Sequence, residues 1–180
     1  MIYTYRECKE KYKSDYEIRK HIAAGRLKRL SRGVYSDSEF EQDLALISRK
    51  YPYAVFTMNS AFYYHGLTDT VPQSYYLITD KDATKIKEQR IYQFFDNNDS
   101  LELGVEMKKQ NGVYIKIFTL ERMLVELIRN KNRLPFDYYK EIIAHYRNLI
   151  FELDIQAVQE YAMQLPKSKL VMETLQLEVF

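Results

Sequence analysis

The stretch Ile22–Ser36, IAAGRLKRLSRGVYS, places four arginines or lysines in the seven positions 26–32, between two glycines. Apolar residues alternate loosely with the basic ones, and Gly33 can supply a turn. The pattern predicts a small β-hairpin with an apolar inner side and a basic outer side. The inner side is assigned Leu27, Leu30 and Val34, and the outer side Lys28, Arg29 and Arg32.

Two short helices are predicted before this hairpin. Thr4 can cap a helix that runs to about Lys13, and Ser14 or Asp15 can cap a second helix. The second helix is predicted over Tyr16–Ala24, because the next residue is a glycine, which readily takes the left-handed conformation that ends many helices.

The second helix carries an apolar face and a basic face. Ile18 and Ile22 are four residues apart and therefore lie on one side, while Arg19, Lys20 and His21 cover much of the remainder. A third helix is predicted to begin at about Ser38, after the hairpin, with an apolar stripe of Phe40, Leu44 and Ile47.

The order helix, helix, basic hairpin, helix is typical of a winged-helix domain, which we predict over residues 1–50. In this fold the second helix of a helix-turn-helix lies in the major groove of DNA, and the hairpin, or wing, reaches the phosphates. The predicted DNA-binding residues are Arg19, Lys20 and His21 on the helix and Lys28, Arg29 and Arg32 on the wing.

The charge distribution favours an anionic partner for this region. Residues 1–33 hold ten basic and four acidic residues, a net charge of +6, whereas the rest of the chain has a net charge of −4. Such asymmetry is typical of a basic module that binds something anionic. The alternative is a basic surface that is merely solvated.

Residues 51–180 are predicted to form a mixed α/β body with a helical C-terminus, so the fold class is α+β. Strands are expected near 53–57, 74–79 and 90–95, with a helix between the first two. The Asn111-Gly112 pair indicates a hairpin, because both residues tolerate a positive φ. Helices are expected from Leu120, after Pro135, near 155–165 and from Ser168. The stripe from Tyr138 to Tyr146 is interpreted as core, with a partner-binding groove as the alternative.

Several classes of protein lack support in the sequence. Cys8 is the only cysteine, which leaves no internal disulfide and favours a reducing, cytoplasmic setting. No apolar run is long enough for a transmembrane helix. The three histidines have no metal-ligand spacing, and no glycine-rich phosphate-binding loop or Gly-Ser nucleotidyltransferase signature is present. We therefore expect no enzyme activity, no metal and no cofactor.

Two further groups of polar residues are interpreted as structural. Ser60, His65 and Asp69 lack the spacing and the nucleophile-elbow motif of a hydrolase, so Asn59 or Ser60 is expected to cap a helix that ends at His65. The paired acids Glu121 and Glu126, like Glu102 and Glu106, are expected to be helix-start charges or to lie on solvated faces.

Three segments together resemble the AbiEi family of antitoxins and transcriptional regulators. The first is GRLKRLSRGVYS, the second FTMNSAFYYHGLTDTVPQSYYLIT, and the third begins at FTLERMLVE. Matching positions in the first two are Gly25, Leu27, Arg29, Leu30, Arg32, Gly33, Val34 and Tyr35, then Ser60, Ala61, His65, Gly66, Leu67 and Pro72. The third matches at Glu121 and Arg122, but this chain has Glu126 where the family often has aspartate.

The resemblance implies an antitoxin of a type IV-like system that represses its own promoter at inverted repeats. It also implies antagonism of a cognate nucleotidyltransferase-like toxin, with residues 51–180 as the antagonising domain. Two copies would be needed on inverted repeats, as a homodimer or by cooperative loading. The alternatives are a protein–protein adaptor, a winged-helix regulator without a toxin partner, and an enzyme of unrecognised type.

Overall fold

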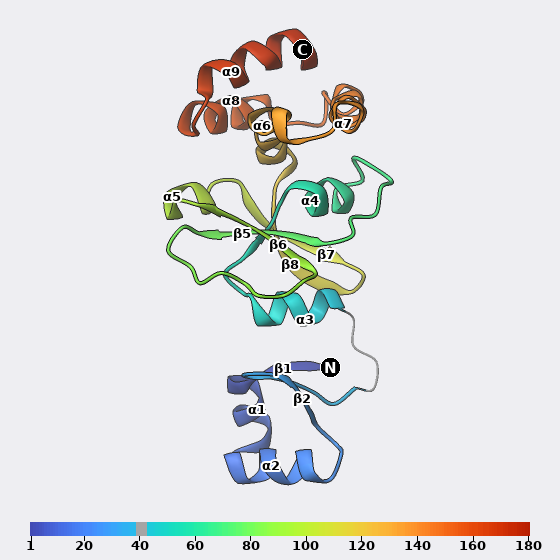
Figure 1. The fold of residues 1–180 in the computed structure, drawn as a ribbon, viewed down its shortest axis with the longest axis vertical. Coiled ribbons are helices and arrows are strands. Elements are labelled where there is room, and N and C mark those ends of the chain that lie inside the picture. Colours follow the sequence, from blue (N-terminus) through green and yellow to red (C-terminus); the bar gives the residue numbers. More distant parts are fainter. Residues whose placement is uncertain (39–42) are drawn as a thin grey trace. The chain divides into compact units, whose positions relative to one another are not determined.

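The computed structural model describes residues 1–38 and 43–180 and has a mixed α and β fold, as predicted (Figure 1). The chain divides into two compact units. The first comprises Met1–Tyr53 and Lys109–Tyr114, and the second comprises Ala54–Lys108 and Ile115–Phe180.

The first unit begins with β1 (Ile2–Thr4), α1 (Tyr5–Tyr12) and α2 (Asp15–Ala23). The predicted basic hairpin follows as β2 (Lys28–Ser31) and β3 (Val34–Ser36), and then α3 (Asp43–Lys50). The strands form a sheet in the order β1-β3-β2, with both pairs antiparallel. The predicted start of the third helix near Ser38, including Phe40, falls on or beside residues 39–42, which lie outside the described residues.

Both predicted helix caps are confirmed. The Thr4 hydroxyl accepts a hydrogen bond from the backbone N–H of Glu7, whose carboxylate accepts the N–H of Thr4 in return, a capping box. The Ser14 hydroxyl caps α2 by accepting from the N–H of Glu17. Lys13 (φ +68°) and Gly25 (φ +69°) take left-handed conformations at the ends of α1 and α2.

A small apolar core holds the first unit together. Its buried members come from β1, both helices and the hairpin, and Tyr12 and Ile22 pack against them. Leu27, at the start of the hairpin, is 1% exposed and anchors the basic run to this core. The buried members are Tyr3, Cys8, Ile18, Leu27 and Tyr35.

A five-stranded sheet in the order β6-β5-β4-β8-β7 belongs to the second unit, except for the joined ends of β7 and β8 at residues 109–114, which are part of the first. β4 pairs antiparallel with β5 and parallel with β8, and β5 pairs parallel with β6. The Asn111-Gly112 turn between β7 and β8 has φ values of +49° and +81°, which confirms the predicted hairpin. The strands are β4 (Val55–Phe56), β5 (Tyr75–Asp80), β6 (Ile91–Asp96), β7 (Val105–Gln110) and β8 (Val113–Phe118).

Two helices lie among the strands of this unit and a helical end follows them (Figure 1). α6 is packed against α4, α8 and α9, so its residues from Arg122 to Ile128 are all buried. The residues that α7 buries include Tyr139, Ile142 and Tyr146, in agreement with the core interpretation. The helices are α4 (Met58–Tyr64), α5 (Asn98–Leu101), α6 (Leu120–Arg129), α7 (Phe136–Asn148), α8 (Ile155–Gln164) and α9 (Ser168–Thr174), with a 3-10 turn at Lys131–Arg133 and a π-helical turn at Leu175–Val179.

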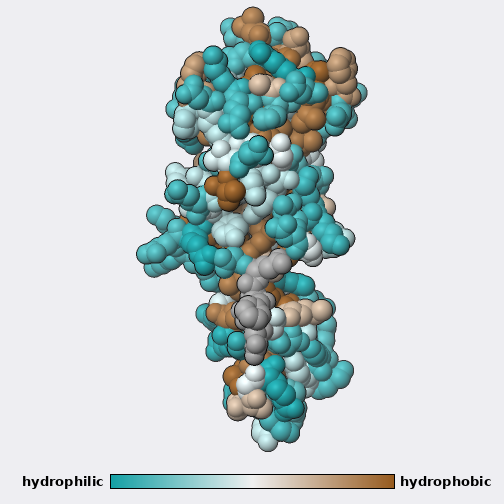
Figure 2. Space-filling model, turned by 90° about the vertical axis from the view of Figure 1, so that its right-hand side faces the viewer, coloured by the Kyte–Doolittle hydropathy of each residue, from teal (hydrophilic) through white to brown (hydrophobic). Residues whose placement is uncertain are grey.

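Hydrophilic residues cover most of the face drawn in Figure 2, and the apolar residues visible there form separate small areas. Among the helices of residues 1–38 and 43–180, none is both long and apolar enough to span a membrane.

Candidate nucleic-acid interface

Helix α2 presents the first three predicted DNA-binding residues to different surroundings. Arg19 and Lys20 are exposed, on the side of the helix away from buried Ile18. His21 is half-buried, and its ring lies 4.5 Å from the ring of Tyr12 on α1. The outward face of α2 is therefore basic through Arg19 and Lys20, while His21 also packs against α1.

The hairpin carries the other three predicted DNA-binding residues. Lys28 and Arg29 are exposed on β2, and Arg32 is exposed in the turn before β3. The register of pairing between β2 and β3 shifts between Arg29 and Ser31, so the ladder is irregular there. Gly33 completes the turn at φ +77°, a conformation that costs glycine little.

Among the described residues, ion pairs engage several helix cations of this unit, though not Lys13 or Arg19, and no cation of the hairpin segment. On α1, Arg6 pairs with Glu10 at 3.2 Å and Lys9 with Asp15 at 3.4 Å. On α2, Lys20 lies 3.6 Å from Glu17. The four cations of the hairpin segment have no ion pair with any residue in the described part of the chain. They are Arg26, Lys28, Arg29 and Arg32, of which Arg26 was not among the predicted contacts although it belongs to the same basic run.

A polar cluster secures the base of the hairpin. The N-terminal ammonium, the hydroxyl of Tyr3 and the Nζ of Lys11 all donate to the carboxylate of Asp37, at 2.6, 2.6 and 3.0 Å. These donors hold the pKa of Asp37 well below its ordinary value. The cluster joins β1 and α1 to the residue that follows β3, so the hairpin is fixed at the end opposite its basic turn.

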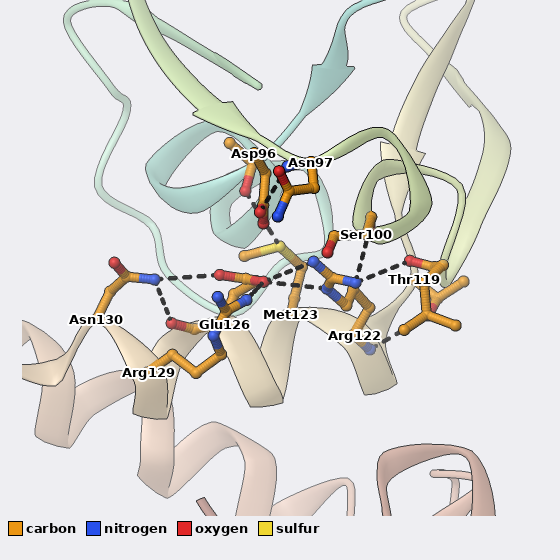
Figure 3. Close-up of polar contacts among 11 residues, drawn as sticks. Asp96, Asn97, Ser100, Thr119, Arg122, Met123, Glu126, Arg129 and Asn130 are labelled. Carbon is orange, nitrogen blue, oxygen red and sulfur yellow. Dashed lines mark hydrogen bonds and ion pairs between the residues drawn. The ribbon is translucent and has the colours of Figure 1, made fainter. Parts of the chain in front are cut away.

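A second polar cluster, in the second unit, was not predicted. Figure 3 shows the side chains of Arg122, Arg129 and Asn130 turned toward Glu126. The Glu126 carboxylate accepts from Arg122 Nε and Nη2 at 3.1 and 2.8 Å and from Arg129 Nη1 at 2.5 Å. Asn130 Nδ2 donates to its other oxygen at 3.1 Å.

The burial of this cluster corrects the prediction that Glu126 lies on a solvated face. The side chains of Arg122 and Glu126 are 0% and 7% exposed. Burial lowers the pKa of Arg122, and Glu126 opposes that shift. The signal available in the sequence was an arginine and a glutamate four residues apart, Arg122 and Glu126, with only apolar residues between and just after them.

Ser60 and His65 make contacts with different parts of the backbone, and the cap expected for this helix was wrong. Thr57, rather than Asn59 or Ser60, occupies the cap position of α4. The Ser60 hydroxyl instead accepts from the backbone N–H of Tyr76 at 2.9 Å. His65 ends the helix as expected, and its Nε2 donates to the carbonyl of Phe118 at 2.7 Å, so Ser60 and His65 are engaged with different partners.

The described residues contain no group of three or more His, Cys, Asp or Glu side chains that could hold a metal ion. Comparison of the chain with protein-family models and with curated proteins found no match.

Proposed function

We propose that residues 1–50 form a winged-helix DNA-binding module and that the chain is a non-catalytic antitoxin and autorepressor. In this proposal it works in the cytoplasm, binds inverted repeats in its own promoter as two copies, and antagonises a nucleotidyltransferase-like toxin. The observation that carries the DNA-binding part is the hairpin segment with four exposed cations that no described acid neutralises.

The element order of the first unit supports this proposal. Two capped helices joined by a short turn precede an antiparallel hairpin, and β1 adds a third strand to it. Helix-turn-helix proteins place the second helix of such a pair in the major groove, and a wing adds backbone contacts. Under this arrangement Arg19 and Lys20 face the groove, while Lys28, Arg29 and Arg32 bind phosphates, which supply most of the affinity.

The antitoxin part rests on the family resemblance and on the charge of the remaining chain. Residues 34–180 carry a net charge of −4, which disfavours strong DNA binding by that part and suits a basic protein partner. An adaptor without DNA binding is the second candidate, and the unpaired hairpin cations count against it.

The test is a gel-shift titration with the DNA upstream of the gene and with a scrambled duplex, at about 50 mM and about 200 mM salt. We expect preferential binding to the upstream DNA that weakens steeply with salt. The variant Arg29→Ala with Arg32→Ala should weaken binding to both duplexes and reduce the salt slope by about 2, one unit for each lost phosphate contact.

A matched control is Lys87→Ala with Lys169→Ala, which removes the same charge from exposed positions of the second unit. It should bind DNA nearly as the parent does, since only nonspecific attraction is reduced. If the parent and the Arg29/Arg32 variant bind DNA equally well, the assignment of the hairpin as a DNA-binding wing is wrong. Weak, equal binding to both duplexes together with a stable toxin complex would favour the adaptor.

A further inference from the structure

One face of the second unit's sheet carries a row of aromatic rings. Tyr76 on β5 and Tyr92 on β6 are direct neighbours in the parallel register, and their ring centroids are 5.3 Å apart at an interplanar angle of 24°. Phe94 lies two residues further along β6, with centroids 6.3 Å from Tyr76 and 5.1 Å from Tyr92. Tyr92 is 56% exposed, so the row is open to solvent.

These rings form the floor of an open groove, which we call the aromatic groove. Its larger cavity has a volume of about 740 Å³, within the range of about 300–1,000 Å³ usual for small-molecule sites. Asn59 forms part of its wall, and Arg133, Leu134 and Pro135 border it. A smaller cavity of about 120 Å³ adjoins it, sharing Met58, Phe94, Phe95 and Arg133.

The smaller cavity is the cationic end of the aromatic groove. It is lined by Arg129, Asn130 and Arg133, with Asp96 and Glu126. Glu126 is shared between the guanidinium groups of Arg122 and Arg129 (Figure 3). The lining itself holds two guanidinium groups, Arg129 and Arg133, and two carboxylates, and the buried Arg122 behind it adds a third guanidinium, so the cluster as a whole carries one excess positive charge. Arg133 is exposed and has no ion pair with a described residue.

The combination of an exposed aromatic ring, Tyr92, with the guanidinium groups of Arg133 and Arg129 defines the class of ligand. Exposed rings stack well on planar heterocycles, and they accept any base because every base has a π-face. Guanidinium groups bind phosphate oxygens through paired hydrogen bonds. The side-chain amide of Asn59 has no hydrogen-bond partner among the described residues and is available to a base edge. Met58, which lines both cavities, has φ +44°, a left-handed conformation that is costly for this residue type and recurs at ligand sites.

We propose that the aromatic groove binds a phosphorylated nucleoside, with the base stacked on the exposed ring of Tyr92 and the phosphate at Arg133, beside Arg129. The source of this ligand is either a free nucleotide or the phosphorylated end of a single strand, since both present the same chemistry. The site is independent of the proposed DNA-binding hairpin, because every residue of the groove belongs to the second unit.

The experiment is isothermal titration of the full chain with ribonucleoside mono- and triphosphates, with inorganic phosphate, and with a short 5′-phosphorylated single-stranded oligonucleotide. Saturable nucleotide binding is expected. Tyr92→Leu should weaken it by about 5-fold or more, since the stacking surface is lost, and Arg133→Ala by roughly 10-fold. Tyr92→Phe keeps the ring and should retain binding. Both positions are exposed, so these variants are expected to fold.

Matched controls remove an aromatic ring and a charge elsewhere in the second unit. Phe151→Ala removes a 99% exposed ring and Lys169→Ala a 91% exposed cation. Both should bind nucleotide like the parent, as should the Arg29/Arg32 variant, even if that variant loses DNA binding. This last comparison separates the groove from the proposed wing.

The titrations either support or overturn the proposed nucleotide site. Binding of the oligonucleotide but not of free nucleotides supports it and identifies the single strand as the source. Absence of binding by either form overturns it, as does binding that Tyr92→Leu and Arg133→Ala leave unchanged. Phosphate that binds as tightly as nucleotides also overturns it, because the rings then contribute nothing.

Discussion

Glu126→Ala tests how much the buried cluster of α6 stabilises the second unit. The substitution removes the acceptor of four hydrogen bonds and leaves Arg122 and Arg129, with side chains 0% and 13% exposed, without their shared carboxylate. Removing one partner of a buried ion pair costs about 3–5 kcal/mol, because the remaining charge stays desolvated. Because domains are typically stable by about 5–15 kcal/mol, this variant should lose about a third to a half of a margin of roughly 10 kcal/mol.

Urea unfolding followed by far-ultraviolet circular dichroism measures this effect as a lower transition midpoint. The matched control is Glu102→Ala, which removes a 70% exposed carboxylate that lies 3.4 Å from Lys116 in the same unit. An exposed pair of this kind contributes about 0–1 kcal/mol. If Glu126→Ala lowers the midpoint no more than Glu102→Ala does, the cluster is not a desolvated ion-pair network. Arg122→Met with Glu126→Leu should recover part of the loss, because it removes two of the three charges together and leaves only Arg129 without its partner.

Two other substitutions test the second unit. Burial lowers the pKa of His65 from 6.5 to about 4, and Lys108 adds to the shift. Below about pH 6.5 the unfolded chain therefore binds a proton at this histidine, whereas the folded chain does not until the pH is near 4. Stability should therefore fall by about 1–2 kcal/mol between about pH 7 and pH 5, after allowance for the partly exposed ring, and His65→Gln should remove this dependence in urea titrations at the two pH values. Gly104→Ala should cost about 2 kcal/mol or more, since Gly104 has φ +67° and a Cβ there would lie 2.7 Å from Arg122 Cβ. Gly66→Ala, at φ +72° in open space, is the control, and an equal loss of thermal stability in the two variants would exclude the contact with Arg122 as the cause.

The elements that could be predicted are those specified by neighbours in sequence. The caps at Thr4 and Ser14, the left-handed residue Gly25 and the Asn111-Gly112 turn each act within a few residues, and the structure contains all of them. β1 was missed because it is three residues long and is a strand only through pairing with β3, about thirty residues later. Because β3 is distant in the sequence, no local sequence pattern could indicate that β1 pairs with it.

The environment of α6 could not be predicted for a similar reason. A helix with one apolar stripe and charges on the other side is predicted to bury only the apolar face and to expose the charged face to solvent. Here α4, α8 and α9 pack around α6, and Glu126 finds Arg122 and Arg129 inside that packing. The aromatic groove was missed because its residues come from a helix, two strands and a turn that are separated by up to about eighty positions. The apolar and aromatic residues of Tyr75–Asp80 and Ile91–Asp96 predicted two strands, but they did not indicate that Tyr76, Tyr92 and Phe94 share one face of a sheet.

The arrangement of charge in the first unit bears on whether its basic hairpin serves the fold or a partner. Cations near the end of α2, such as Lys20, are favourable there because they complement the helix dipole. The hairpin cations have no such role, and like charges close together repel one another. Their clustering therefore adds nothing to stability that the structure can identify. It follows that Arg29→Ala with Arg32→Ala should leave the melting temperature unchanged or slightly higher while DNA binding weakens. A clear loss of thermal stability in that variant would instead mean that these side chains support the hairpin itself.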